Sequence, residues 1–209
     1  MQLRPVSADD FRPRVPGVTQ GRAVLRTIKG ARFNSWSELE VAVKDGFAVV
    51  PDHLSIMTVA HRHGRSDLAP QTAIIEGWDR WRGAYASTYS HDSHNLVAYG
   101  FEPAEMALAA NTVIEMGGGI AVVQDGRVSA RIAYPVAGLL SDKGPAEVAA
   151  AHRAVVEAAG RICTWQPPYR TFKALEGQSL ACNPGPHLTD LGMTDGSTKE
   201  IRGSVIRSR

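Results

Sequence analysis

The side chains best suited to chemistry lie together in one short stretch, residues 87–95, called here the polar segment. It contains two imidazoles, those of His91 and His94, together with a carboxylate, an amide and several hydroxyls. Apolar-rich runs flank it at residues 83–86 and 96–99. A buried polar group without a partner costs about 1–3 kcal/mol, so a stretch this polar between two strand-like runs rarely serves packing alone. We therefore expect the functional site at the polar segment.

Four of the 7 histidines form two close pairs, His61 with His63 and His91 with His94. Each pair lies where a strand-like run ends or turns, and neighbouring strands are only about 5 Å apart, so the pairs can converge. This predicts a divalent metal site for zinc, manganese or iron, with Asp92 as a further oxygen ligand. The alternative is a polar turn whose histidines hydrogen-bond backbone groups. His61 and His63 share one side of a strand, whereas His91 and His94 share a side only if their segment turns.

Other candidate residues also have simple structural explanations. Glu115 ends an expected helix, where it can shuttle a proton or be merely solvated. The glycines at 117–119 can bring backbone amides to a ligand, or they simply stop that helix. Residues 141–142, Ser-Asp, favour a helix N-cap or present a carboxylate. Trp78 and Trp81 can stack on a planar ring or pack in the core.

Helix and hairpin signals define the elements that position these side chains. One helix is expected to begin at Pro103, and a second, alanine-rich helix is expected from Pro145 to Gly160. The Asp-Gly pairs at 45–46 and 125–126 each separate two apolar runs and predict β-hairpins. The sequence thus predicts an α/β (α+β) fold: a single domain with a mixed β-sheet, hairpins, two main helices and an irregular C-terminal segment.

Composition is that of an ordinary globular protein. The 209 residues are 44% hydrophobic and 21% charged, and the net charge of +2 indicates no partner nucleic acid or acidic membrane. No long apolar run predicts a membrane span, and 2 cysteines make no disulfide framework, which favours a cytoplasmic location. We expect an extended arm over residues 1–20, one domain over 21–195 and a polar tail over 196–209. The proline-rich arm and a tryptophan-rich loop predict a homo-oligomer.

Six segments of the sequence carry a family resemblance: RHG (62–64), ASTYSHDSHNLV (86–97), EMALAAN (105–111), IEMGGG (114–119), PVAGLLSD (135–142) and PHLTDLG (186–192). In this order they resemble the C-terminal domain of bacterial adenine deaminases. The resemblance extends from about residue 17 to about residue 195 and is specific because several motifs match in one order.

The resemblance implies an enzyme family of the amidohydrolase type. In that family a (β/α)8 barrel binds the catalytic metals and hydrolyses the exocyclic amine of adenine. A barrel needs roughly 200 residues or more, and this sequence has no spare length for it. The ligands and base of the barrel are therefore not carried over, and His61-Arg62-His63 is not its His-x-His motif, because its neighbours match the C-terminal domain. His61 adds an imidazole where another residue is usual, which favours a metal here.

Two functions from different classes follow. The first is a stand-alone metal-dependent hydrolase that cleaves a carbon–nitrogen bond of a purine-like or other N-heterocyclic small molecule. Its metal would be held by the two histidine pairs, and the bound water would act as nucleophile. Asp92 or Glu115 would shuttle the proton, and Ser93 or Asn95 would orient the substrate. The alternative is a non-catalytic accessory subunit or ligand-binding module that partners a separately encoded amidohydrolase barrel.

Overall fold

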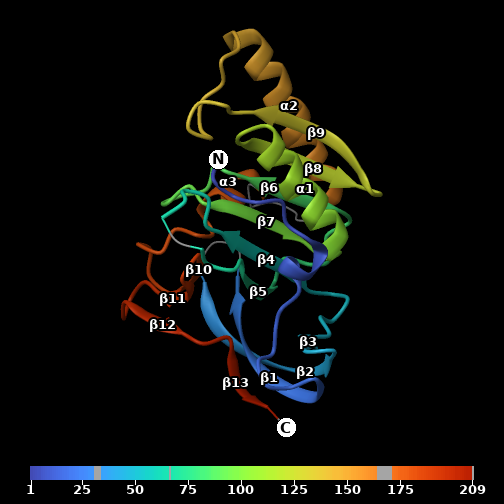
Figure 1. The fold of residues 1–209 in the computed structure, drawn as a ribbon, viewed down its shortest axis with the longest axis vertical. Helices are drawn as coiled ribbons and strands as arrows, with labels where there is room; N and C mark the ends of the chain where they lie inside the picture. The colour runs from blue at the N-terminus through green and yellow to red at the C-terminus, as the bar shows by residue number, and fades with distance from the viewer. Residues whose placement is uncertain (31–33, 66, 164–170, 209) are drawn as a thin grey trace.

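A computed structural model describes residues 1–30, 34–65, 67–163 and 171–208. Its main feature is one large mixed sheet (Figure 1). The strands of this sheet are β1 (Gln20–Lys29), β2 (Ser35–Lys44), β3 (Phe47–Ala48), β4 (Ser55–Ala60), β5 (Gln71–Glu76), β6 (Ala84–Ser87), β7 (Leu96–Gly100), β8 (Gly119–Gln124), β9 (Arg127–Ala133) and β13 (Val205–Ser208). The 10 strands follow the order β3-β2-β1-β5-β4-β7-β6-β8-β9, and β13 pairs with β1. Among the strand pairs that the structure describes, only β1 and β5 run parallel, so the predicted mixed sheet is confirmed.

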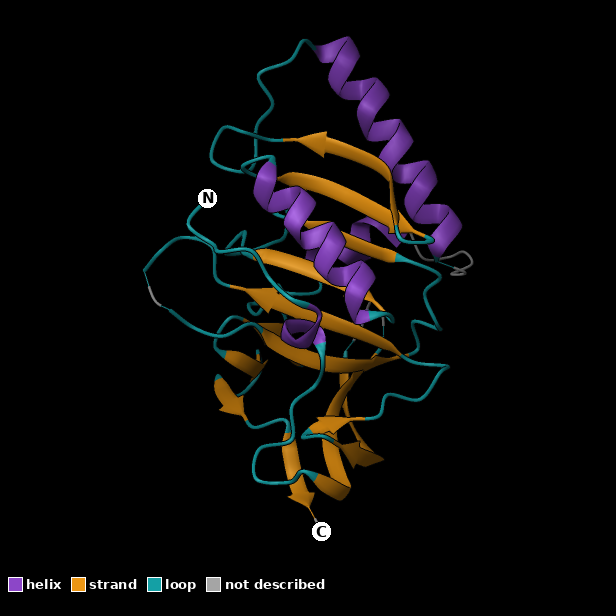
Figure 2. Cartoon of the chain, turned by 45° about the vertical axis from the view of Figure 1, so that its right-hand side comes forward, coloured by secondary structure: helices purple, strands orange, loops and turns teal. Residues whose placement is uncertain are grey.

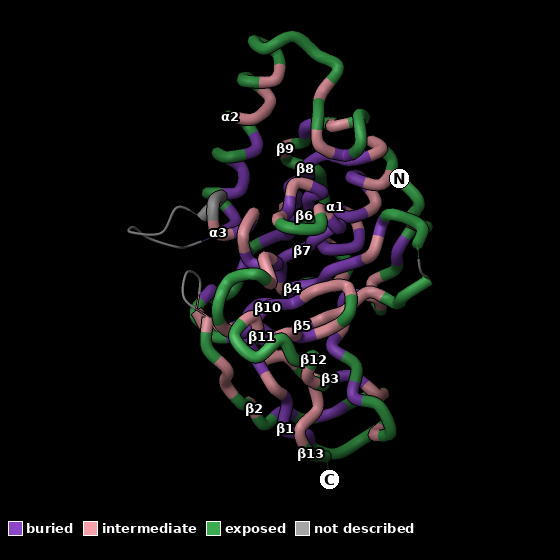
Figure 3. The backbone as a smooth tube through the Cα atoms, turned by 90° about the vertical axis from the view of Figure 1, so that its left-hand side faces the viewer, coloured by how far each residue is buried: buried purple, intermediate pink, exposed green. Residues whose placement is uncertain are grey.

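Helices cover both faces of the sheet at its β7-β6-β8 end. Helix α1 (Pro103–Glu115) packs on one face, and α2 (Pro145–Ile162) with the short α3 (Thr171–Gly177) packs on the other (Figure 2). Side chains alternate along a strand, and here small alanines of β6 and β7 face α1 while Tyr85 and Tyr99 face α2. The strands β4 and β7 are therefore buried along their whole length (Figure 3).

The two tryptophans considered as ligand-stacking residues belong to the core. Trp78 and Trp81 are 0% and 1% exposed. Their rings stack on Tyr99, with centroids 5.3 and 5.9 Å away. Buried aromatic surface of this kind contributes to stability and is closed to a ligand. The structure therefore supports the core interpretation.

Both predicted hairpins form, and the two predicted helices are present with adjusted ends. The turns at 45–46 and 125–126 place both central residues at positive φ, as a two-residue hairpin turn requires. Helix α2 is capped by the backbone of Gly144, so the cap expected at residues 141–142 was wrong. Pro145 fills the first helical position, where its missing N–H costs nothing, and Gly160 lies inside the helix, which ends at Ile162.

The two ends of the chain pack against the sheet. In the N-terminal arm, η1 (Ala8–Phe11) and the buried Val6 lie against α1. Near the other end, β10 (Pro186–Thr189), β11 (Gly192–Asp195) and β12 (Glu200–Arg202) form a small antiparallel sheet. The domain boundaries at residues 20 and 195 stay predictions. Within the described ranges, no helix has the length and apolar character needed to cross a membrane.

Candidate functional site

The polar segment joins β6 to β7 at one edge of the sheet. Ser87 pairs with Val97 of β7 and with Ile120 of β8, so the segment lies between the ends of three strands. At the same edge, Ala60 at the end of β4 pairs with Leu96 at the start of β7. The first histidine pair follows Ala60 directly, and the structure therefore places both pairs at this edge.

Thr88 attaches the segment to two glycine-containing turns. Its backbone N–H donates to the Gly119 carbonyl at 3.0 Å. Its buried hydroxyl donates to the Gly138 carbonyl at 2.7 Å and accepts the Gly119 N–H at 2.9 Å. The glycines at 117–119 thus serve as a helix stop and as a close packing partner of Thr88, which is the simpler of their two predicted roles.

The middle of the segment is held by α3 and the residues after it. The His91 N–H donates to the Glu176 carbonyl at 2.8 Å. The Ser179 hydroxyl lies 2.6 Å from both the His91 carbonyl and the Ser90 hydroxyl. These hydrogen bonds join residues about ninety positions apart in sequence, so the segment keeps one backbone conformation only when the whole domain is folded.

Arg62 holds the C-terminal end of the polar segment. It is 5% exposed, and its guanidinium donates to the carbonyls of His94 and Ala137, the second at 2.9 Å. Burial lowers the pKa of this guanidinium from its usual value. Sequence reasoning missed this residue, although a cation placed between two histidines directly after a buried strand signals an internal hydrogen-bonding role.

The first histidine pair faces protein groups. His61 Nδ1 lies 2.8 Å from a carboxylate oxygen of Asp190, and its Nε2 accepts the Arg65 N–H at 3.2 Å. Those contacts assign the proton to Nδ1 and occupy both ring nitrogens. His63 donates through Nε2 to the Ser93 carbonyl at 2.9 Å. His61 therefore connects the end of β4 to the β10–β11 turn, and His63 connects the residues after β4 to the polar segment.

The second pair forms an aromatic cluster with Tyr89. The ring centroids of His91 and His94 are 5.2 Å apart, and the ring centroid of Tyr89 lies 5.4 Å from that of His91 and 6.0 Å from that of His94. Burial, followed by the neighbouring His91 and Arg62, lowers the pKa of His94, which favours the neutral imidazole. Within the described part of the chain, His94 Nδ1 and Asn95 Oδ1 are buried atoms without a hydrogen-bond partner.

The four imidazoles do not fit a resident metal ion. No group of three or more His, Cys, Asp or Glu side chains in the described ranges is arranged to hold one. Both nitrogens of His61 are occupied, and His63 uses Nε2 as a donor, which leaves no lone pair there for a metal. We therefore assign no chemical step to a metal bound by this set.

The remaining predicted catalytic residues differ in position. Asp92 and Ser93 are exposed at the tip of the polar segment. Asn95 is buried, and its amide donates to the Ser93 hydroxyl at 3.0 Å. Glu115 is exposed at the end of α1, and no contact described for it joins it to the polar segment. The structure thus brings three of the four together and leaves Glu115 apart.

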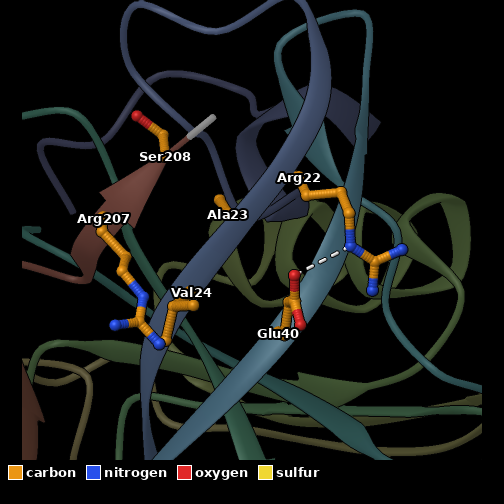
Figure 4. A pocket seen from close by; sticks show the side chains of 6 residues that line it. All are labelled: Arg22, Ala23, Val24, Glu40, Arg207 and Ser208. Atoms are coloured by element: carbon orange, nitrogen blue, oxygen red, sulfur yellow. Dashed lines mark hydrogen bonds and ion pairs between the residues drawn. The ribbon is translucent and has the colours of Figure 1, made fainter.

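A pocket of about 580 Å³ adjoins the polar segment. Tyr89 forms part of its wall and also touches both histidines of the second pair. The other walls come from β8, α2, α3 and residues 134–145; among them are Ile120, Tyr134, Leu139, Val148 and Glu176. A second depression, between β1, β2 and β13, is only about 120 Å³ and is lined on one side by the Arg22–Glu40 ion pair (Figure 4). Sequence reasoning missed the larger pocket, because its walls are distant in sequence.

Comparison with known proteins identifies the domain type. A family model described as adenine deaminase C-terminal domain matches residues 32–200. The adenine deaminase of Serratia proteamaculans is 52% identical over 206 residues, which are 99% of this chain and 35% of the relative. The adenine deaminase of Klebsiella pneumoniae is 51% identical over 209 residues, 100% of this chain and 35% of the relative. Adenine deaminase 2 of Rhizobium meliloti is 49% identical over 206 residues, 99% of this chain and 34% of the relative.

The matches cover almost all of this chain but only about a third of the length of these relatives. The family match begins just before β2 and ends at the start of β12, so it includes α1, α2, α3 and the polar segment, whereas η1, β1 and β13 lie outside it. The resemblance noted in the sequence is therefore confirmed, and the chain belongs to the adenine deaminase C-terminal domain family.

Proposed function

We propose that this chain takes part in the hydrolytic deamination of adenine, as the domain that works beside an amidohydrolase barrel carried on the same or on another polypeptide. The observation that supports this most is the construction of the polar segment. Its backbone is fixed by Thr88, Ser179 and Arg62, while Asp92 and Ser93 remain exposed at its tip. A rigid support with polar side chains at its exposed end suits contact with a substrate or with an active-site entrance.

In this proposal the polar segment binds and orients. The imidazole of His91 can donate and accept hydrogen bonds, Asp92 accepts, and Ser93 does both, which matches the mixed donors and acceptors on the edge of a purine. Asn95 holds Ser93 through its amide, and His61 is a structural residue. The hydrolytic step belongs to the barrel, and no proton transfer is assigned to Glu115.

A stand-alone metal-dependent hydrolase is the competing prediction. Such a hydrolase needs all four imidazoles to bind one ion, but those of His61 and His63 already hydrogen-bond other groups of the protein. The purified chain, assayed alone with added zinc, manganese or iron, tests it directly. We expect no conversion of adenine and less than one ion per chain. Conversion with one tightly held ion would favour the stand-alone enzyme.

Complementation tests the proposed function. The third of the Serratia proteamaculans adenine deaminase that matches this chain is removed, and the present chain is supplied in its place, fused or separate. We expect restored release of ammonia from adenine. The double variant His91→Ala/Asp92→Ala should lower the restored rate at least tenfold, and His53→Ala, whose side chain is 74% exposed, should leave it unchanged. Failure of the folded chain to restore any activity would contradict the proposal.

A further inference from the structure

The pocket beside the polar segment has the size and position of a binding site. Its volume of about 580 Å³ lies inside the range of roughly 300–1,000 Å³ found for small-molecule sites. It lies where β8, α2 and α3 meet the polar segment, and the connection from β9 to α2 supplies the rest of its wall. A purine base fits such a volume with room for bound water.

The walls favour a planar ring. Tyr89 and Tyr134 supply aromatic side chains, and Ile120, Leu139 and Val148 supply aliphatic ones. Aromatic faces stack on every nucleobase, and apolar side chains cover the rest of such a ring. Burial is the largest cause that raises the pKa of the Tyr134 hydroxyl. The nearby Glu176 carboxylate raises this pKa further, and Tyr89 adds a smaller contribution.

The polar groups favour a neutral ligand. One carboxylate, that of Glu176, and one ammonium, that of Lys143, line the pocket together with Ser141 and His152. Their charges balance, so the pocket gives no net attraction to an anion or a cation. The Ser141 hydroxyl and the Lys143 ammonium offer donors for ring nitrogens, and the Ser141 hydroxyl also offers an acceptor for a ring N–H or amino group.

We propose that this pocket binds a neutral, planar N-heterocycle of purine size, namely adenine or its deaminated product, within the chain itself. The proposal rests on the function proposed above for the identity of the ligand, and it adds a binding site separate from the exposed tip of the polar segment. A ring stacked on Tyr89 would also restrain His91 and His94, because Tyr89 contacts both. Occupancy of the pocket would thereby stiffen the polar segment.

Calorimetric titration of the purified chain with adenine and with hypoxanthine tests the proposal. We expect saturable binding at one site per chain. Val148→Trp fills the pocket and should weaken binding at least tenfold, whereas Val156→Trp on the same helix, at a position 39% exposed and outside the pocket, should change it less than twofold. Tyr134→Leu removes a stacking face and should weaken binding about tenfold, which provides a second variant if Val148→Trp does not fold.

Three results would overturn the inference. They are no binding up to the solubility limit of either base, equal binding by Val148→Trp and Val156→Trp, and adenosine monophosphate bound as tightly as adenine. Amide hydrogen exchange adds a readout, because adenine should slow exchange at the His91 N–H. Complementation reports separately on the proposed function: restored deamination without binding to the isolated chain would refute the pocket assignment alone.

Discussion

β8 and β9 are joined by the two-residue turn at 125–126, whereas β6 and β7, which are also antiparallel neighbours, are joined by residues 88–95. The short turn is specified locally, because Asp125 and Gly126 adopt the positive φ angles that it needs. The long connection is specified by distant residues, among them Arg62, Gly138 and Ser179. The comparison shows that a connection can be as ordered as a turn while its order comes from the rest of the fold.

Two glycine-to-alanine substitutions, one before β8 and one after it, should differ most in the stability that they remove. In Gly118→Ala the new carbon would lie 2.4 Å from the Gly138 Cα, at a φ of +133°. We expect a loss of about 4 kcal/mol or more in the free energy of unfolding, because backbone must move. In Gly126→Ala nothing lies within 4 Å of the new carbon, and the φ of +69° alone should cost about 1 kcal/mol. Urea denaturation compares the two; equal losses would contradict the comparison.

Replacement of Arg62, which holds the end of the polar segment, should lower the free energy of unfolding by an intermediate amount. Arg62→Met keeps much of the side-chain volume but leaves the carbonyls of His94 and Ala137 without their donor. We expect a loss of about 3 kcal/mol, since hydrogen bonds to charged groups are worth about 1.5–3 kcal/mol each and part of the loss is recovered by water. The exposed Arg65→Met should change stability by less than about 0.5 kcal/mol. Thermal and urea unfolding give both values.

The smallest expected effect is on the pH dependence of the free energy of unfolding, through His94 of the second histidine pair. Burial, His91, Arg62 and His63 lower the pKa of His94, and Asp92 opposes them. The folded state therefore binds this proton more weakly than the unfolded state, so the free energy of unfolding should fall as the pH drops below about 6.5, until the folded-state pKa is passed. His94→Gln should remove this slope, and the exposed His53→Gln should keep it. Urea midpoints between pH 7.5 and 5 measure it; the same slope in both variants would contradict the assignment.

Local signals in the sequence account for much of the fold. Proline at a first helical position located α1 and α2, and the Asp-Gly pairs located two hairpins. Elements after Gly160 were missed, because α3 and the β10–β12 sheet lack strong local signals and depend on packing against the large sheet.

The site at the polar segment stays a prediction, and the contacts of its side chains could not be inferred from the sequence. A polar stretch between apolar runs predicted the position of the site, and the structure places this stretch beside the ends of β4 and β6 and the start of β8. The partners of the histidines, such as Asp190, lie far away in sequence and could not be inferred from spacing. Catalytic roles for Asp92, Ser93 and Asn95, a cytoplasmic location and a homo-oligomer stay predictions; fractionation and light scattering test the last two.

The two edges of β1 have consequences for the order of folding. One edge pairs with β2 along its whole length, and this hairpin is local in sequence. The other edge is shared by β5, at Ile28 and Lys29, and by β13, at Ala23 to Leu25. Contacts of such long range carry a large loop-closure entropy and slow the approach to the native state. During synthesis, part of β1 therefore stays an open strand edge until residues 205–208 emerge, and this interval is when the chain is most exposed to association with other copies.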